Sequence, residues 1–249
     1  MGVAVIDAHV TAGVNSCSSI TPDDLLALMD RQSISQAVLS PVDQWLAVDN
    51  REGNDTLLRW IRAWPDRFLG YAAANPWYGQ RAVAELERAL EDGLHAIKLH
   101  PARQGFMLLE HIVEPLITVA ARRGIPVYVV TGVPIASMPL QLAELARRFP
   151  EVPFIMGRSG RTDFALDLIP AVQQAPNIYV ETVYNLPSYL AMVIKAVGPE
   201  RVVFASDVPM THLQLEVEKL DLVPMDPKAR DAVMGGTVAR ILGISHGGR

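Results

Sequence analysis

The sequence predicts an α/β protein of the (β/α)₈ type, a TIM barrel in which residues 1–249 form a single domain. Eight short runs rich in β-branched residues alternate with segments of helical periodicity, which is typical of βαβ units and a parallel sheet. The runs are apolar throughout rather than alternating in polarity, as expected for parallel strands that are buried on both faces. A barrel of this type takes about 250 residues, which matches this chain.

The expected strands are short and evenly distributed along the chain. No GxGxxG or Walker pattern follows any of them, and this favours a closed barrel over an open, doubly wound nucleotide-binding sheet. The expected strands are 3–7, 36–40, 68–73, 96–99, 126–130, 153–156, 178–181 and 201–205.

The helical segments between these strands carry recognisable start and stop signals. The first helix opens with Thr21 as N-cap, Pro22 in the first turn and two acidic residues near the positive end of the helix dipole. Glycines such as Gly93 and Gly124 mark helix ends. The later helices are expected at 55–63, 79–91, 108–123, 139–148, 163–173, 187–197 and 226–242, and the tail 245–249 is expected to fray.

The composition excludes several classes of protein. Hydrophobic residues make up 50% of the chain and charged residues 20%, which suffices for a large core and excludes a disordered chain. The net charge of −5 argues against a nucleic-acid partner. No apolar run approaches the roughly 18 residues of a membrane span, and the N-terminus does not resemble a signal peptide. Cys17 is the single cysteine, so we expect no intrachain disulfide, no Cys-based zinc site and a cytoplasmic location.

Polar residues gather at the carboxyl ends of the expected strands. Because chemistry in a barrel takes place at that end, we expect these side chains to surround one mouth. Lone polar residues at strand ends often only cap helices, as Ser40 and Thr182 would. The residues at or just after the strand ends include Asp7, His9, Lys98, His100, Thr131, Arg158, Glu181, Asp207 and His212.

Seven passages in order along the chain resemble the amidohydrolase-related family (amidohydrolase 2 type) of the metal-dependent hydrolase superfamily. They are 6–9 (IDAH), 36–41 (QAVLSP), 65–68 (PDRF), 96–101 (AIKLHP), 149–153 (FPEVP), 201–209 (RVVFASDVP) and 235–242 (GGTVARIL). The family includes hydrolases of small lactones and amides and decarboxylases of aromatic acids. The resemblance implies a barrel with a divalent metal at its mouth. The ligands would be His-x-His after the first strand, histidines after the fifth and sixth strands, and aspartate after the eighth.

This sequence departs from that ligand pattern at three of five positions. It keeps His9 and Asp207, but has Thr11, Thr131 and Arg158 where the resemblance places histidines. Threonine is a poor neutral ligand, and arginine stays protonated and repels a cation. We therefore expect no cofactor. The alternative is a divalent metal such as zinc held by His9 and Asp207.

His9, Asp207 and Arg158 are the predicted catalytic residues. Arg158 is expected to lie within ion-pair distance of Asp207, either as a structural pair that fills the former metal site or as the group that binds a substrate carboxylate. His9 is either a hydrogen-bonded core residue or a general base whose tautomer Asp7 or Asp207 sets.

Lys98, His100, Thr131, Glu181 and His212 are the predicted substrate-binding residues. Lys98 could also act as a base or form a Schiff base, but a buried ion pair with Glu181 is the favoured interpretation.

Two function classes remain open from the sequence. The first is a hydrolase or carbon–carbon lyase, similar to a decarboxylase, that acts on a small organic acid without the family's usual metal. The second is a non-catalytic barrel that serves as a ligand-binding or subunit protein. The charged residues at the strand ends favour the enzyme. The expected partner is a small carboxylate substrate, with neither nucleic acid nor membrane, and a homo-oligomer is left open.

Overall fold

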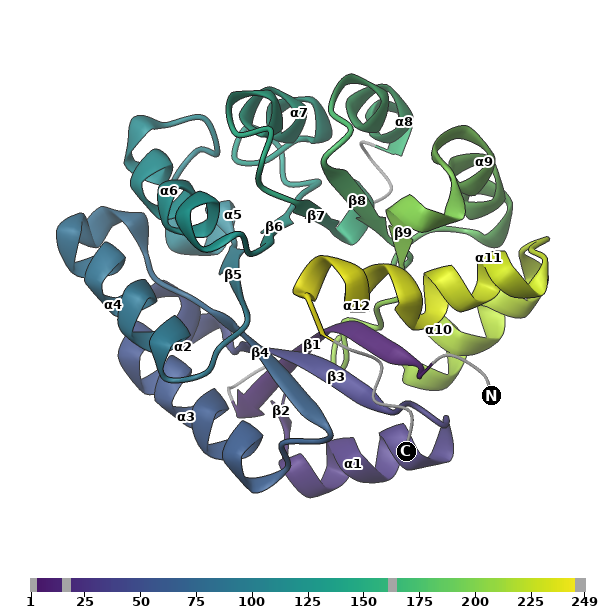
Figure 1. The fold of residues 1–249 in the computed structure, drawn as a ribbon, viewed down its shortest axis with the longest axis horizontal. Helices are drawn as coiled ribbons and strands as arrows, with labels where there is room; N and C mark the ends of the chain where they lie inside the picture. The colour runs from purple at the N-terminus through teal and green to yellow at the C-terminus, as the bar shows by residue number, and fades with distance from the viewer. Residues whose placement is uncertain (1–3, 15–18, 161–164, 245–249) are drawn as a thin grey trace.

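The computed structural model describes residues 4–14, 19–160 and 165–244. Its core is a nine-stranded sheet in the order β2-β1-β3-β4-β5-β6-β7-β8-β9 (Figure 1). Neighbouring strands are parallel except for the antiparallel pair β1–β2. The strands are β1 (Ile6–Val14), β2 (Ser19–Ile20), β3 (Gln36–Pro41), β4 (Phe68–Ala72), β5 (Ala96–Leu99), β6 (Val127–Val130), β7 (Phe154–Gly157), β8 (Ile178–Glu181) and β9 (Val202–Val203).

The eight strands predicted from the sequence are present, with two changes of length that affect the site. Strand β1 continues to Val14 instead of ending at Asp7, so His9 lies within the strand. Its register against β3 shifts between Asp7 and Val10. Strand β9 ends at Val203 instead of continuing to 205. The added β2 is only two residues long and was not predicted, because so short a run carries no periodicity.

The two edges of the parallel sheet meet through backbone hydrogen bonds. The amide of Ala8 donates to Phe204 O at 2.9 Å, and the amide of Thr11 donates to Val208 O at 2.8 Å. Between them, the amide of Asp207 donates to His9 O at 3.0 Å. These bonds place Asp207 beside His9, although the two residues lie at opposite ends of the sequence.

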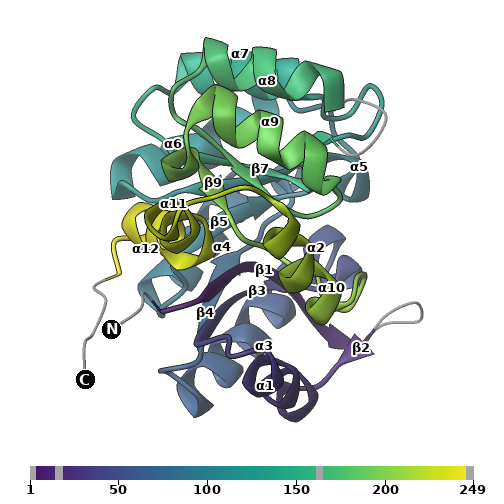
Figure 2. The ribbon, with the colours of Figure 1, turned by 90° about the vertical axis from the view of Figure 1, so that its right-hand side faces the viewer.

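Helices surround the sheet on its outer side (Figures 1 and 2). The α-helices are α1 (Pro22–Arg31), α2 (Asp43–Ala47), α3 (Asn50–Ala63), α4 (Gln80–Glu91), α5 (Pro101–Gln104), α6 (Glu114–Arg123), α7 (Pro139–Arg148), α8 (Ala165–Gln174), α9 (Pro187–Val197), α10 (Leu213–Glu218), α11 (Pro227–Asp231) and α12 (Thr237–Leu242). The Thr21 N-cap is confirmed, since its hydroxyl accepts from the Asp24 amide at 3.2 Å.

Several helix boundaries differ from the prediction. The helix expected at 55–63 begins at Asn50, and the one expected at 108–123 begins at Glu114 after a 3₁₀ turn. The segment 226–242 is divided by a π-helical turn at Ala232–Gly236. Gly235 lies here with its Cα against the backbone of Ala4, where a Cβ atom would come within 2.1 Å of the Ala4 oxygen. The tail 245–249, for which the sequence predicts fraying, and Cys17 lie outside the described residues.

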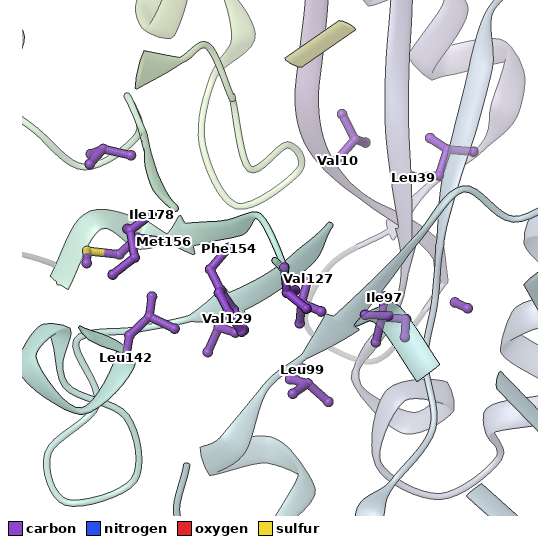
Figure 3. Packing of buried hydrophobic residues seen from close by; sticks show 14 of the residues in the cluster. Val10, Leu39, Ile97, Leu99, Val127, Val129, Leu142, Phe154, Met156 and Ile178 are labelled. Carbon is purple, nitrogen blue, oxygen red and sulfur yellow. The ribbon is translucent and has the colours of Figure 1, made fainter. Parts of the chain in front are cut away.

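Side chains alternate across the strands and form two apolar clusters. The larger one packs the sheet against the helices, and Figure 3 shows its side chains from strands β1, β3 and β5–β8 and from α7. Ile97 and Leu99 of β5 belong to it, so Lys98 between them faces the other side of the strand. The register pairs Lys98 with Tyr128, which belongs to the second cluster on that opposite face. Among the described residues, no helix is both long and apolar enough to cross a membrane.

Candidate active site

Four side chains from different strands form one buried chain of polar contacts. Arg158 Nε lies 3.2 Å from Asp207 Oδ2. Asp207 Oδ1 lies 3.3 Å from His9 Nδ1. His9 Nε2 in turn lies 2.7 Å from Lys98 Nζ. The expected ion pair between Arg158 and Asp207 is therefore confirmed, while the catalytic roles of these residues stay predictions.

Ser40 extends this chain at its Lys98 end, and Tyr184 joins it at Asp207. Lys98 Nζ donates to Ser40 Oγ at 2.8 Å, and Ser40 Oγ also lies 3.2 Å from His9 Nε2. Tyr184 donates its hydroxyl to Asp207 Oδ2 at 2.9 Å, and the Arg158 guanidinium carbon lies 5.8 Å from the centre of the Tyr184 ring. From the sequence alone Ser40 is expected only to cap a helix, although its position near the end of β3 is the signal that places it at the mouth.

Three residues of this cluster have backbone conformations that non-glycine residues rarely adopt. The φ angle is +58° at Arg158, +63° at Tyr184 and +54° at Asp207. Each residue sits in the turn that follows a different strand of the sheet. Such conformations cost energy and persist only where the surrounding structure imposes them, most often at functional sites. These turns bring the side chains of Arg158 and Tyr184 to the Asp207 carboxylate.

Burial sets the protonation of the His9 and Lys98 side chains. The His9 ring is fully buried, and desolvation, followed by the nearby charges of Lys98 and Arg158, holds its pKa well below 6.5. Since Nδ1 faces the Asp207 carboxylate, we assign the proton to Nδ1 and the lone pair to Nε2. Desolvation also lowers the pKa of Lys98 to about 8, despite the opposing charges of Asp207 and Glu181.

The favoured ion pair between Lys98 and Glu181 is not formed. Lys98 contacts His9 and Ser40 instead. Glu181 accepts a hydrogen bond from the Tyr128 hydroxyl at 2.9 Å and another from the Arg158 amide, so both of its oxygens are occupied. Burial raises the pKa of Glu181 to about 8, and the neighbouring Asp207 charge adds to this effect. A partly protonated Glu181 is a weak counter-ion for a lysine.

Asp7 does not orient the His9 ring, because its carboxylate is engaged elsewhere. It accepts hydrogen bonds from the Ser206 amide at 2.9 Å, the Ser206 hydroxyl at 2.5 Å and the His9 amide at 3.2 Å. Burial raises the pKa of Asp7 to about 7. Of the two carboxylates considered for the tautomer of His9, the structure places Asp207 next to the ring.

The other three predicted substrate-binding residues, His100, Thr131 and His212, lie in different surroundings. His100 follows β5 and is 5% exposed, and neither ring nitrogen has a hydrogen-bond partner among the described residues. The hydroxyl of Thr131 is used within the protein, since it donates to Gly157 O at 2.8 Å and accepts from the Gly160 amide at 2.9 Å. His212 is exposed at the start of α10 and lines a pocket of about 300 Å³ beside Pro209, apart from the buried chain.

The described residues fit a metal ion poorly. They contain no group of three or more His, Cys, Asp or Glu side chains arranged to hold one, whereas a catalytic zinc site normally has three protein ligands. Within the described part of the chain, His9 Nδ1, Asp207 Oδ1 and Arg158 Nε are buried without a conventional hydrogen-bond partner. However, Lys98 contacts the other ring nitrogen of His9, and Arg158 contacts the other oxygen of Asp207. Two cations thus lie beside the only two ligands that the resemblance would retain.

Solved structures share this fold over nearly the whole chain. An uncharacterized TIM-barrel protein from Bordetella bronchiseptica is 18% identical with a TM-score of 0.78, covering 96% of this chain and 98% of its own. A 5-carboxyvanillate decarboxylase from Novosphingobium aromaticivorans, complexed with manganese and a nitrobenzoic acid, is 15% identical with a TM-score of 0.80 and coverages of 98% and 97%. A dihydroxybenzoic acid decarboxylase from Polaromonas, with bound manganese and 2-nitroresorcinol, is 16% identical with a TM-score of 0.77 and coverages of 97% and 97%.

These comparisons correct the expectation that no cofactor is used. Two of the similar structures hold manganese, which points to a divalent metal cofactor in this family and contradicts the prediction of none. That prediction rested on the three substituted ligand positions alone.

A family model also identifies the chain, whereas no similar sequence was found among curated proteins. The model is that of the amidohydrolases, and it matches residues 18–244. The match agrees with the resemblance seen in the seven sequence passages, and it supports an enzyme of the hydrolase or lyase type. The chain belongs to the amidohydrolase family.

Proposed function

We propose that this protein is a hydrolase or carbon–carbon lyase that acts on a small organic carboxylate, with decarboxylation as the favoured reaction. The observation that carries the proposal is the buried chain Arg158–Asp207–His9–Lys98, in which His9 and Lys98 belong to β1 and β5 and the other two residues follow β7 and β9. Decarboxylases of aromatic acids share the fold, so aromatic carboxylates are the first substrates to test. The carboxylate class itself rests on the chemistry of the site.

Arg158 is the residue that binds the carboxylate in this proposal. Its ion pair with Asp207 uses Nε, so within the described part of the chain the Nη donors remain available to a ligand. A guanidinium presents its donors in a planar fork that matches a carboxylate. The Arg158 side chain keeps 14% exposure while Asp207 is fully buried, so Arg158 is the part of the ion pair that meets solvent.

His9 is the proposed proton-transfer residue. Asp207 orients its ring through Nδ1 and stabilises the imidazolium that forms when Nε2 accepts a proton. Hydrolysis needs this base to activate water, and a lyase needs the same group to return a proton to carbon. Lys98, Glu181 and His100 line this region as proposed substrate-binding groups, and Thr131 and His212 stay predictions. Because the donor set does not fit a metal centre, we derive no step through the cofactor of the family.

The fold proposal is a closed (β/α)₈ barrel formed by one domain over residues 1–249. The hydrogen bonds that join β1 to residues 204–208 support closure, as does the likeness to a TIM-barrel protein. A cytoplasmic location and assembly into a homo-oligomer also stay predictions.

Binding and turnover assays test the function, each with and without added Mn²⁺. Calorimetry with benzoate measures carboxylate binding, and carbon dioxide release from 2,6-dihydroxybenzoate and 5-carboxyvanillate measures turnover. Hydrolysis is measured on a panel of lactones and amides. We expect Arg158→Met to abolish benzoate binding and the matched surface variant Arg81→Met to retain it. Arg81 is exposed beside the ring of Tyr78. Benzoate binding that survives in Arg158→Met would refute the assignment of Arg158. Binding without any turnover would support a ligand-binding barrel instead.

A further inference from the structure

Lys98 has an environment that its proposed role in substrate binding does not explain. Buried lysines normally pair with a carboxylate, because an isolated ammonium group is costly to bury. The Lys98 side chain is 3% exposed, yet no described carboxylate lies within ion-pair distance of its Nζ atom. Its two close partners are the uncharged His9 Nε2, at 2.7 Å, and Ser40 Oγ, at 2.8 Å.

The surroundings of Lys98 provide the groups that amine catalysis needs. The lone pair of His9 Nε2 points to Nζ and can take a proton from it, while Asp207 supports the resulting imidazolium. The same Asp207 pairs with Arg158, so one carboxylate connects the residue proposed to bind the substrate carboxylate with the histidine beside the amine. The centre of the apolar Tyr128 ring lies 5.4 Å from Nζ and covers one side of the amine.

We propose that Lys98 is a nucleophile that forms an imine with the carbonyl group of a small 3-oxo acid and thereby decarboxylates it. This inference rests on the proposed function, since it takes Arg158 as the site of the substrate carboxylate. Beyond that function, it assigns a covalent role to Lys98 and requires a carbonyl group in the substrate.

The reaction balances without any further reactant. Lys98 Nζ attacks the carbonyl carbon, forming a C–N bond, and loses a proton to His9 Nε2. The carbonyl oxygen takes one proton from solvent and a second proton from His9. It then leaves as water, and the protonated imine remains. The bond to the carboxylate carbon then breaks, its electron pair moves into the imine as an enamine, and carbon dioxide departs. A proton adds to the enamine carbon, and water hydrolyses the imine to the ketone and free Lys98.

Reductive trapping of the whole protein tests this step. Acetoacetate with sodium cyanoborohydride should form a stable secondary amine, which peptide mass mapping locates among only four lysines. Lys195 and Lys228 are exposed and Lys219 is paired with Glu216, so these three serve as internal controls. We expect the adduct on Lys98, its loss in Lys98→Met and its retention in Lys228→Arg. Butyrate, which has the carboxylate but no carbonyl, should compete with acetoacetate without forming an adduct.

The outcomes separate this inference from the proposed function. If acetoacetate binds to the wild type and no adduct forms on Lys98, or if labelling is equal on all exposed lysines, the imine is refuted while carboxylate binding stands. If butyrate and acetoacetate both fail to bind, the proposed function itself is refuted. The mapping is done on the wild-type protein, so its result holds even if Lys98→Met does not fold.

Discussion

Replacing Arg158 by methionine tests the charge balance of the site. Arg158 Nε and Asp207 Oδ2 lie 3.2 Å apart, and the Asp207 side chain is fully buried. At an effective dielectric constant of about 20, two unit charges at this distance attract by about 5 kcal/mol before desolvation is subtracted. Removing one partner of a buried pair leaves the other charge without compensation and typically costs about 3–5 kcal/mol. We therefore expect Arg158→Met to lower the free energy of unfolding by about 3 kcal/mol, since Tyr184 still donates to Asp207.

Urea denaturation followed by circular dichroism measures this loss, and a second substitution identifies its cause. In the double variant Arg158→Met/Asp207→Asn the uncompensated carboxylate is gone, so much of the stability should return. Together with the two single variants, it forms a double-mutant cycle that gives the interaction free energy between Arg158 and Asp207. Arg81→Met should change stability by no more than about 0.5 kcal/mol, because Arg81 is exposed. The reasoning is wrong if Arg158→Met costs less than about 1 kcal/mol, or if the double variant is as unstable as the two single losses added together.

Three further predictions concern the same cluster. Tyr184→Phe removes a hydrogen bond to a buried carboxylate and should cost about 1.5 kcal/mol of stability by urea denaturation, and an unchanged midpoint would contradict the contact. Burial raises the pKa of Glu181 to about 8, so the folded state holds this proton and unfolding releases it. The contribution of Glu181 to the unfolding free energy should therefore fall as pH rises from about 4.5 to 8. Glu181→Gln removes this contribution, so the difference in unfolding free energy between wild type and variant should fall over that range, and a difference that does not change with pH would count against the shift. Arg158→His replaces a cation beside His9 and Asp207 by a metal-binding side chain, so calorimetry should show tighter Mn²⁺ binding than in the wild type, and equal or weaker binding would oppose the role given to Arg158.

The sequence by itself determined the α/β class of the fold and assigned the candidate site to one end of the sheet. Continuous β-branched runs such as Ile178–Glu181 and the capped helix after Thr21 are local signals, and both appear in the structure. Parallel strands joined by helices bring all carboxyl ends to one side, so residues as distant as Lys98 and Asp207 could be assigned to one region from their positions alone. The family resemblance, too, depended only on residues in order.

Only the tertiary structure decided which of these side chains touch. The bonds between β1 and residues 204–208 bring Asp207 to the His9 ring, and left-handed turns direct Arg158 and Tyr184 to the same carboxylate. Lys98 meets His9 and Ser40, whereas Glu181 accepts from Tyr128 and from the Arg158 amide. A strand pattern gives the face of each residue but not the register across the sheet's joined edges or the φ angle of a turn. These depend on packing between segments far apart in sequence, which no local pattern records.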